Sequence, residues 1–216
     1  MNIFKLSLKT IGQIIFVITF FSILEAKNLD KFNEADKVSD YFSGILLLND
    51  SQYKESFKFL KKLNGLEESH INYSIKYLYS LVNSGNLNEA FNYSRKLEKQ
   101  KLDIFESNLI TGVFYLKNSN LDLAKKYFLK AKNIKSKSIL NNYVSSSLYN
   151  WSSFKDSDIN SATLELNKID KRFENLKKIQ KVFLNCYYDT PSTNKLFIEL
   201  NSDNKIDFSR YNYFHA

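Results

Sequence analysis

The sequence contains very little glycine, proline or cysteine. Five glycines and one proline in 216 residues are too few for collagen, glycine-rich phosphate loops, dinucleotide-binding fingerprints or turn-dense β-sandwiches. A single cysteine excludes an intramolecular disulfide, and two histidines without a cysteine pair argue against a zinc site of the common nitrogen and sulfur type. Long helices remain as the way to fold this chain.

Arginine is also scarce, although the chain is basic and rich in aromatic residues. The formal net charge is +8, but the only arginines are Arg95, Arg172 and Arg210. Proteins that read nucleic acids favour arginine because its forked donors match bases and phosphates. A nucleic-acid partner is therefore not expected. An RNA-associated helical repeat is kept as the alternative because of the positive charge and the 14 tyrosines and 18 phenylalanines.

Residues 1–26 have the pattern of a secretory signal. Lys5 and Lys9 precede an uncharged apolar stretch from Ile11 to Leu24, and the chain is strongly polar after Ala26. The stretch is shorter than the about 20 residues that span a bilayer, which favours a cleaved signal. We therefore expect an exported protein in the periplasm or on the periplasmic face of the inner membrane. An uncleaved N-terminal anchor and a buried first helix are the alternatives.

An internal period of about 34 residues predicts the rest of the fold. One column of this period consists of Gly44, Leu78, Gly112 and Ser146. A second column consists of Ser56, Ala90 and Ala124. After a polar lead-in at 27–36, these columns place repeats near 37–70, 71–104, 105–138 and 139–172, with a degenerate repeat at 173–201.

Each repeat is expected to contain two helices joined by a short turn. In the second repeat, the spacing of Ile75, Tyr79 and Val82 defines one helical face, and Gly85 ends that helix in a conformation that glycine adopts readily. Small side chains recur where the two helices of a repeat must approach closely. These structural positions are Gly44, Ser56, Ala90, Gly112, Ala124, Ala131 and Ala162.

With these residues the chain resembles the tetratricopeptide repeat family, which has the same period. The resemblance implies an all-α fold, a right-handed superhelical solenoid of antiparallel helix pairs with about four to five repeats over residues 37–216. The chain departs from the family in two ways. None of its repeats ends in the family's proline, and it has no tryptophan in the column where the family often has one. That column holds Asp40, Ser74, Asn108 and Asn142. Residues 207–216 resemble the start of a further helix, so we expect a fragment of a longer protein.

The resemblance also places the first helices of the repeats along a concave groove. An exposed apolar strip of this size is costly unless a partner covers it, so a peptide or helix of another protein is the expected ligand. There are two alternatives: the chain's own N-terminal segment covers the strip, or tighter curvature of the helical array closes it. The expected groove residues are Tyr41, Ile45, Leu48, Ile75, Tyr79, Val82, Leu109, Val113, Leu116 and Tyr143.

No catalytic, metal-binding or cofactor-binding residues are predicted. The sequence has no Ser-His-acid order, no His-Glu-x-x-His and no P-loop. Cys186 is expected to be a buried small hydrophobe, and Trp151 is either a core residue or part of the groove. Lysine pairs such as Lys61-Lys62 and Lys125-Lys126 face solvent or, alternatively, an anionic membrane. The expected function is a non-catalytic protein-interaction scaffold of the bacterial cell envelope, with an activity in a missing C-terminal part as a further alternative.

Overall fold

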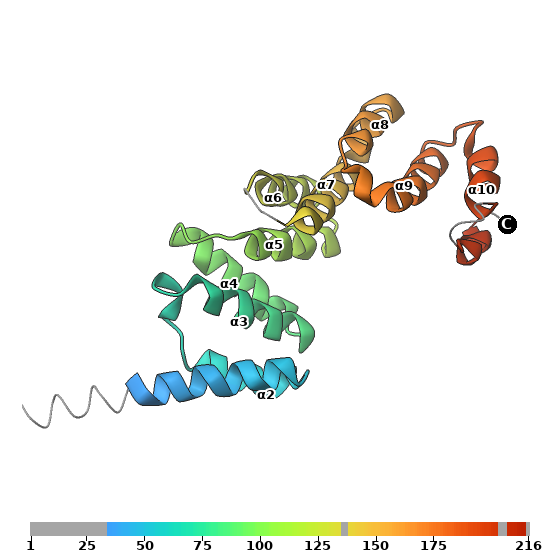
Figure 1. Ribbon diagram of the computed structural model, residues 1–216. Helices are drawn as coiled ribbons and strands as arrows, with labels where there is room; N and C mark the ends of the chain where they lie inside the picture. The colour runs from blue at the N-terminus through green and yellow to red at the C-terminus, as the bar shows by residue number, and fades with distance from the viewer. Residues whose placement is uncertain (1–33, 135–137, 203–206, 215–216) are drawn as a thin grey trace, which may run out of the picture. The chain divides into compact units, whose positions relative to one another are not determined.

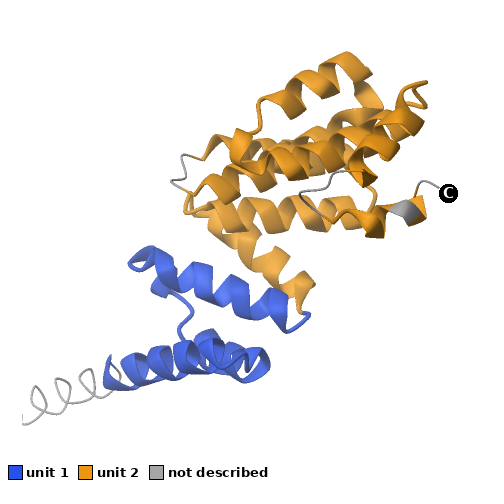
Figure 2. Cartoon of the chain, turned by 45° about the vertical axis from the view of Figure 1, so that its right-hand side comes forward, with its two compact units in different colours: residues 1–85 blue, residues 86–216 orange. Residues whose placement is uncertain are grey.

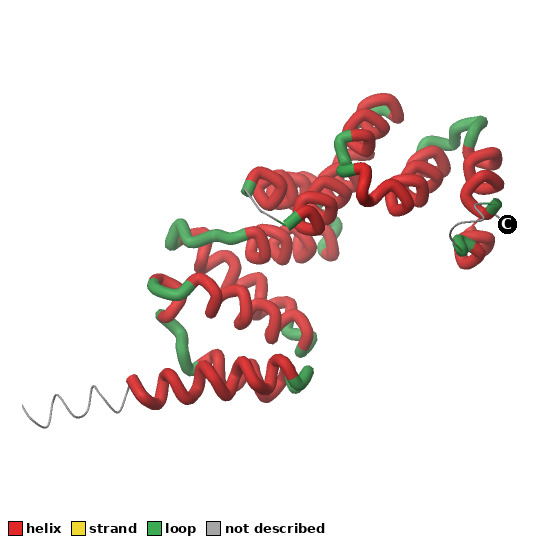
Figure 3. The backbone as a smooth tube through the Cα atoms, in the orientation of Figure 1, coloured by secondary structure: helices red, strands yellow, loops and turns green. Residues whose placement is uncertain are grey.

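The computed structural model describes residues 34–134, 138–202 and 207–214 (Figure 1). Throughout these residues the regular secondary structure is helical, and none of them forms a strand (Figure 3). The predicted signal or anchor at 1–26 and most of the lead-in at 27–36 lie outside the described residues. Within the described ranges, no helix combines the length and the apolar character needed to cross a membrane.

The helices follow one another along the chain and pack in consecutive pairs. Residues 34–49 form the first described helical segment. The later elements are α2 (Tyr53–Lys61), η1 (Leu66–Glu68), α3 (Ile71–Asn83), α4 (Leu87–Lys99), α5 (Phe105–Lys117), α6 (Leu121–Asn133), α7 (Ile139–Ser153), η2 (Phe154–Asp156), α8 (Ile159–Asn167), η3 (Lys171–Phe173), α9 (Glu174–Tyr187), α10 (Thr193–Asn201) and η4 (Ser209–Phe214).

The starts of the helices carry the period that the sequence predicts. The first helices of three successive predicted repeats, α3, α5 and α7, begin one full period apart at Ile71, Phe105 and Ile139. The second helices α2, α4 and α6 begin with the same spacing at Tyr53, Leu87 and Leu121. The predicted all-helical fold of consecutive helix pairs is confirmed, and its arrangement is consistent with a helical repeat.

The chain divides into two compact units, Met1–Gly85 and Asn86–Ala216 (Figure 2). The described part of unit 1 contains the helical residues 34–49, α2, η1 and α3, and the described part of unit 2 contains α4 to α10 with η2, η3 and η4. The sequence interpretation treated 37–216 as one domain. The division falls at the turn between the two helices of the predicted second repeat.

In unit 1, small side chains let two helices approach closely. A Cβ atom placed on Gly44 would lie 2.7 Å from the side chain of Leu60 on α2. The Ser56 hydroxyl donates to the carbonyl oxygen of Gly44 over 2.8 Å, and the Tyr73 hydroxyl on α3 donates to the carbonyl oxygen of Leu60 over 3.0 Å. Leu60 and Tyr73 are completely buried, so these contacts form part of the core of unit 1.

Unit 2 repeats this packing between α5 and α6 and adds two apolar clusters further along the chain. A Cβ atom on Gly112 would lie 2.5 Å from the ring of Phe128. The partly buried Trp151 packs against the first cluster, so it is a core residue rather than an open binding position. The first cluster is Phe154, Ala162, Leu166, Ile169 and Leu184. The second cluster is Val182, Phe197, Leu200 and Phe208.

The turn within each of the first three predicted repeats contains one left-handed residue. Such residues recur with the period of the repeat, with φ of 60°, 82° and 58° at Ser51, Gly85 and Ser119. At the third of these turns, the N–H of Asn120 donates to the Tyr115 carbonyl over 2.9 Å and the N–H of Ser119 donates to the Leu116 carbonyl over 3.0 Å. This pair of bonds is the Schellman closure, which satisfies carbonyls at the end of a helix.

Candidate functional site

Charge is distributed very unevenly between the first helices α3, α5 and α7 and the second helices α2, α4 and α6. The only charged residues of α3, α5 and α7 are Lys76, Glu106 and Lys117, and the latter two lie at the ends of α5. The second helices α2, α4 and α6 carry four or five charged residues each, whereas α8 carries only Glu165. The charged residues of α6 alone are Asp122, Lys125, Lys126, Lys130 and Lys132. Each of α3, α5 and α7 therefore presents a nearly uncharged surface, as the predicted apolar groove requires, whereas the first helical segment carries Glu34, Asp36, Lys37 and Asp40.

On α3, the predicted groove residues form an open stripe. Tyr79 is 50% exposed and Val82 is also more than a third exposed, whereas Ile75 is half-buried. Their spacing of i, i+4 and i+7 places them on one side of the helix. The opposite side of α3 contributes Tyr73, Tyr77 and Leu81 to the core. The stripe is thus apolar surface that the core of unit 1 does not use.

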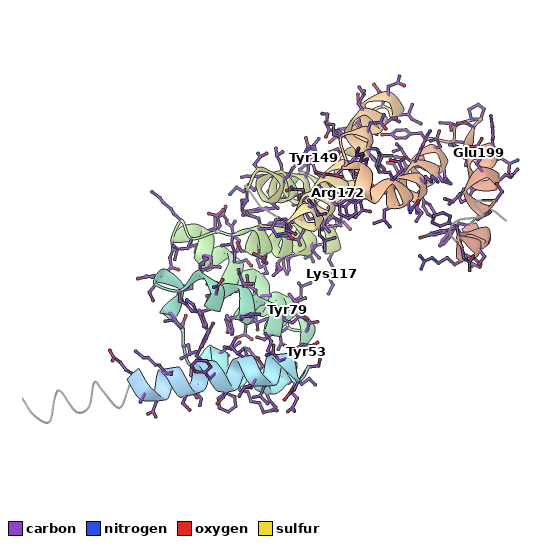
Figure 4. All side chains as sticks on the ribbon, viewed as in Figure 1. Tyr53, Tyr79, Lys117, Tyr149, Arg172 and Glu199 are labelled. Atoms are coloured by element: carbon purple, nitrogen blue, oxygen red, sulfur yellow. The ribbon has the colours of Figure 1, made fainter. Side chains whose placement is uncertain are left out.

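Tyr79 also contacts the start of the neighbouring helix α2 (Figure 4). The rings of Tyr53 and Tyr79 meet edge to face with their centroids 5.9 Å apart. A side-chain hydrogen bond with Tyr53 raises the pKa of Tyr79 above its ordinary value of 10.0. Beside this pair, a cavity of about 370 Å³ is lined by Tyr53, Lys54, Glu55 and Asn83, with Ser51, Gln52 and Ser84. The tyrosine pair gives this end of the stripe both an aromatic surface and hydroxyl groups.

The predicted groove residues of the first helical segment are less accessible. Tyr41 and Ile45 are half-buried, and the Tyr41 hydroxyl lies 3.0 Å from Nε2 of His70. Leu48 is only 6% exposed. Leu48 therefore belongs to the core of unit 1 and differs from the expectation of an open groove position. It lies four residues after the buried Gly44, on the side of the helix that packs inward.

In unit 2, α5 repeats the stripe seen on α3. Val113 and Leu116 are each more than a third exposed, and Leu109 is half-buried. These residues follow Ile75, Tyr79 and Val82 by one period of the repeat. The same two columns of the repeat therefore expose apolar side chains on both helices.

Tyr143 on α7 is placed differently from the other predicted groove residues. Its ring stacks on Phe173 with the centroids 4.5 Å apart. Nε2 of Gln180 on α9 donates to the Tyr143 hydroxyl over 2.8 Å and to Oγ of Ser147 over 2.9 Å. Residues from η3 and α9 thus occupy this side of α7, and Tyr143 contributes to packing instead of an open face.

Ion pairs connect the second helices of unit 2, a feature that the sequence interpretation missed. Glu98 on α4 pairs with Arg95 on the same helix and with Lys130 on α6, and it accepts a hydrogen bond from the Tyr127 hydroxyl over 2.9 Å. Desolvation by burial raises the pKa of Glu98, but the hydrogen bonds from Lys130 and Arg95 outweigh it, so the pKa is lowered from 4.5. Glu98 and Lys130 lie on helices that are not consecutive in the chain, and a single sequence offers no local signal for that pairing.

Further lysines on the second helices or directly after them also have acidic or aromatic neighbours. Lys132 pairs with Glu165 on α8 over 3.0 Å, and Lys62 pairs with Asp40 over 2.9 Å. Nζ of Lys61 lies 5.1 Å from the centre of the Phe57 ring. These contacts favour the interpretation of the lysine pairs as a solvated face.

Among the described residues, no group of three or more His, Cys, Asp and Glu side chains is placed to hold a metal ion.

The single cysteine is placed differently from the prediction. Cys186 is exposed, so the expectation of a buried hydrophobe was wrong. The buried residues of α9 are Val182, Leu184 and Asn185, which leaves Cys186 on the solvent side.

Comparison with known protein families finds no matching family model, and comparisons with curated proteins and with solved structures find no match.

Proposed function

We propose that this protein is a non-catalytic interaction scaffold of the tetratricopeptide type, which binds uncharged segments of a partner protein on the apolar stripes of its first helices α3 and α5. The observation that carries the proposal is the repeated exposure of apolar side chains in two columns. Tyr79 and Val82 on α3 and Val113 and Leu116 on α5 are all more than a third exposed. Exposed apolar side chains that recur with the period of a helical repeat are typical of a ligand-binding face.

The chemistry of these first helices favours a protein ligand over RNA. An RNA-binding face needs cations to neutralise phosphates, and α3, α5 and α7 carry only Lys76 and Lys117. An apolar stripe with i, i+4 and i+7 spacing suits the apolar face of a partner helix or the alternate side chains of an extended segment. Export to the bacterial cell envelope is part of the proposal and rests on the pattern of residues 1–26 alone.

The binding face can be tested with charge substitutions matched for exposure. A variant with Tyr79→Lys and Val113→Lys places one cation on each stripe, whereas a control with Leu129→Lys and Leu164→Lys places two on exposed apolar positions of α6 and α8. Cross-linking capture from the native envelope should yield a protein with wild type and control but not with the first variant. Circular dichroism checks that all three proteins remain helical. Equal capture by all three, or capture that nuclease abolishes, would overturn the proposal.

A further inference from the structure

A second apolar stripe lies on the outward side of the first helical segment in unit 1. Val38, Phe42 and Leu46 are between 56% and 64% exposed and are spaced by four residues. Gly44 and Leu48 are buried and point to the opposite side, toward α2. The stripe therefore comprises three large apolar side chains in a row that the described core of unit 1 leaves uncovered. It differs from the stripe on α3, which carries the proposed function.

Later repeats show what covers the same columns of a first helix. Two periods after Phe42 and Leu46, the corresponding residues of α5 in unit 2 are Ile110 and Phe114. Both are half-buried, and Phe114 stacks on Phe91 of α4 with the ring centroids 3.8 Å apart and the planes at 12°. The preceding second helix thus covers this side of α5.

The fourth repeat follows the same rule. Its residues in these columns, Val144 and Leu148 on α7, are half-buried, and α7 packs on the preceding second helix α6. The stripe on residues 34–49 is accordingly the surface onto which a second helix of a repeat would pack. Its natural complement is an amphipathic helix with an aromatic or aliphatic anchor like Phe91.

The charges beside the stripe indicate which kind of helix suits it. At about 100° per residue, Glu34 and Asp50 border the stripe, whereas Lys37 lies on the far side of the helix. Both border residues are exposed acids. Charge complementarity therefore favours an apolar helix with basic residues beside its apolar face. The helix α4, which covers the corresponding side of α5, has this character. It carries three basic residues, Arg95, Lys96 and Lys99, and two acidic residues, Glu89 and Glu98.

From these observations, we infer that the outward face of residues 34–49 is a second docking surface, which receives a basic amphipathic helix from a partner protein. The helix packs on Val38, Phe42 and Leu46 as α4 packs on α5. This inference does not depend on the groove proposed above, because it uses other residues on another side of unit 1.

The test uses a synthetic peptide of residues 86–101 as the probe, since this segment contains α4, and the full chain as the receptor. Binding is measured by the fluorescence anisotropy of the labelled peptide. Leu46→Asp should weaken binding at least about 10-fold, the ratio that corresponds to about 1.4 kcal/mol. Leu164→Asp is the matched control, because both leucines are 64% exposed, and it should leave binding unchanged. A peptide with Phe91→Asp should not bind.

A second measurement on the peptide-free protein separates a vacant face from one already covered. If the face is vacant, Leu46→Asp leaves the midpoint of thermal unfolding within about 2 °C of wild type, as expected for an exposed site. A clear fall in that midpoint would mean that the chain's own residues 1–33 or a second copy already cover the stripe, which would overturn the inference. Peptide binding that is absent, or equal in the Leu46→Asp and Leu164→Asp variants, would overturn it as well.

Discussion

Gly112 on α5 lies directly against the ring of Phe128 on α6, so closely that a methyl group at position 112 would come within 2.5 Å of that ring. Glycine to alanine inside a helix ordinarily stabilises a protein by roughly 0.5–1 kcal/mol. Here the overlap outweighs that gain, and Gly112→Ala should lower the free energy of unfolding by about 1–3 kcal/mol. Urea unfolding measures the change.

A smaller side chain opposite position 112 should relieve this overlap. Phe128→Leu in the Gly112→Ala background should therefore cost less than Phe128→Leu alone, a coupling that a double-mutant cycle detects. If Gly112→Ala is neutral or stabilising, the close approach of α5 and α6 is not as described.

The recurrent left-handed turn predicts effects of opposite sign at two positions of one column. Ser119 adopts φ of 58°, whereas Gly85 fills the same column without strain. A left-handed conformation costs a non-glycine residue about 1 kcal/mol or more. Ser119→Gly should raise the free energy of unfolding by up to about 1 kcal/mol, and Gly85→Ala should lower it by a similar amount. Thermal unfolding of both variants tests the pair. A loss of stability in Ser119→Gly would show that this turn is not left-handed.

Glu98 should make the stability of unit 2 dependent on pH. Its folded pKa is lowered from 4.5, so its contribution is fully present above 4.5 and is lost as the pH falls through the folded pKa. Glu98→Gln should lower the free energy of unfolding by about 1 kcal/mol at pH 7, because Arg95 and Lys130 lose the negative charge with which both pair. The difference from wild type should narrow at pH 3, as urea unfolding at both values can measure. A difference that is independent of pH would contradict the ion-paired state of Glu98.

Cys186 offers a rapid check on how α9 is oriented. Because its side chain is exposed, a thiol reagent such as Ellman's reagent should modify it in the folded protein nearly as fast as in urea. It is the only cysteine in the chain, so the signal is unambiguous. Protection by a factor of about 100 or more in the native state would mean that α9 turns this side inward.

Features that depend on packing within one repeat could be predicted from the sequence. Gly44 and Gly112 recur because two helices of a repeat meet at that point, and Leu60 or Phe128 fills the space. The starts of α3, α5 and α7 follow from the same period. Each of these features repeats at a fixed spacing, which is visible without any knowledge of long-range contacts.

Features that depend on a particular distant helix could not be predicted in this way. Tyr143 has the same column as Ile75 and Leu109, but Gln180 reaches it from α9, 37 residues further along the chain. The burial of Leu48 and the exposure of Cys186 depend on which side of a helix its neighbours cover. The position of a residue within the repeat shows on which side of the helix it lies, but not whether another helix covers that side. The candidate face therefore includes fewer of the predicted residues than the sequence suggested, and those that are exposed lie on α3 and α5.

Site-specific photo-cross-linking can show whether the exposed stripes on α3 and α5 bind a partner protein. A photo-reactive amino acid is placed at Tyr79 or Val113 on the proposed binding face, or at Leu129 or Leu164 on the second helices, and the protein is irradiated in its native envelope. We expect the same protein partner to be cross-linked from positions 79 and 113, and no protein to be cross-linked from positions 129 and 164. Cross-links of equal yield from all four positions, or only from 129 and 164, would contradict this expectation.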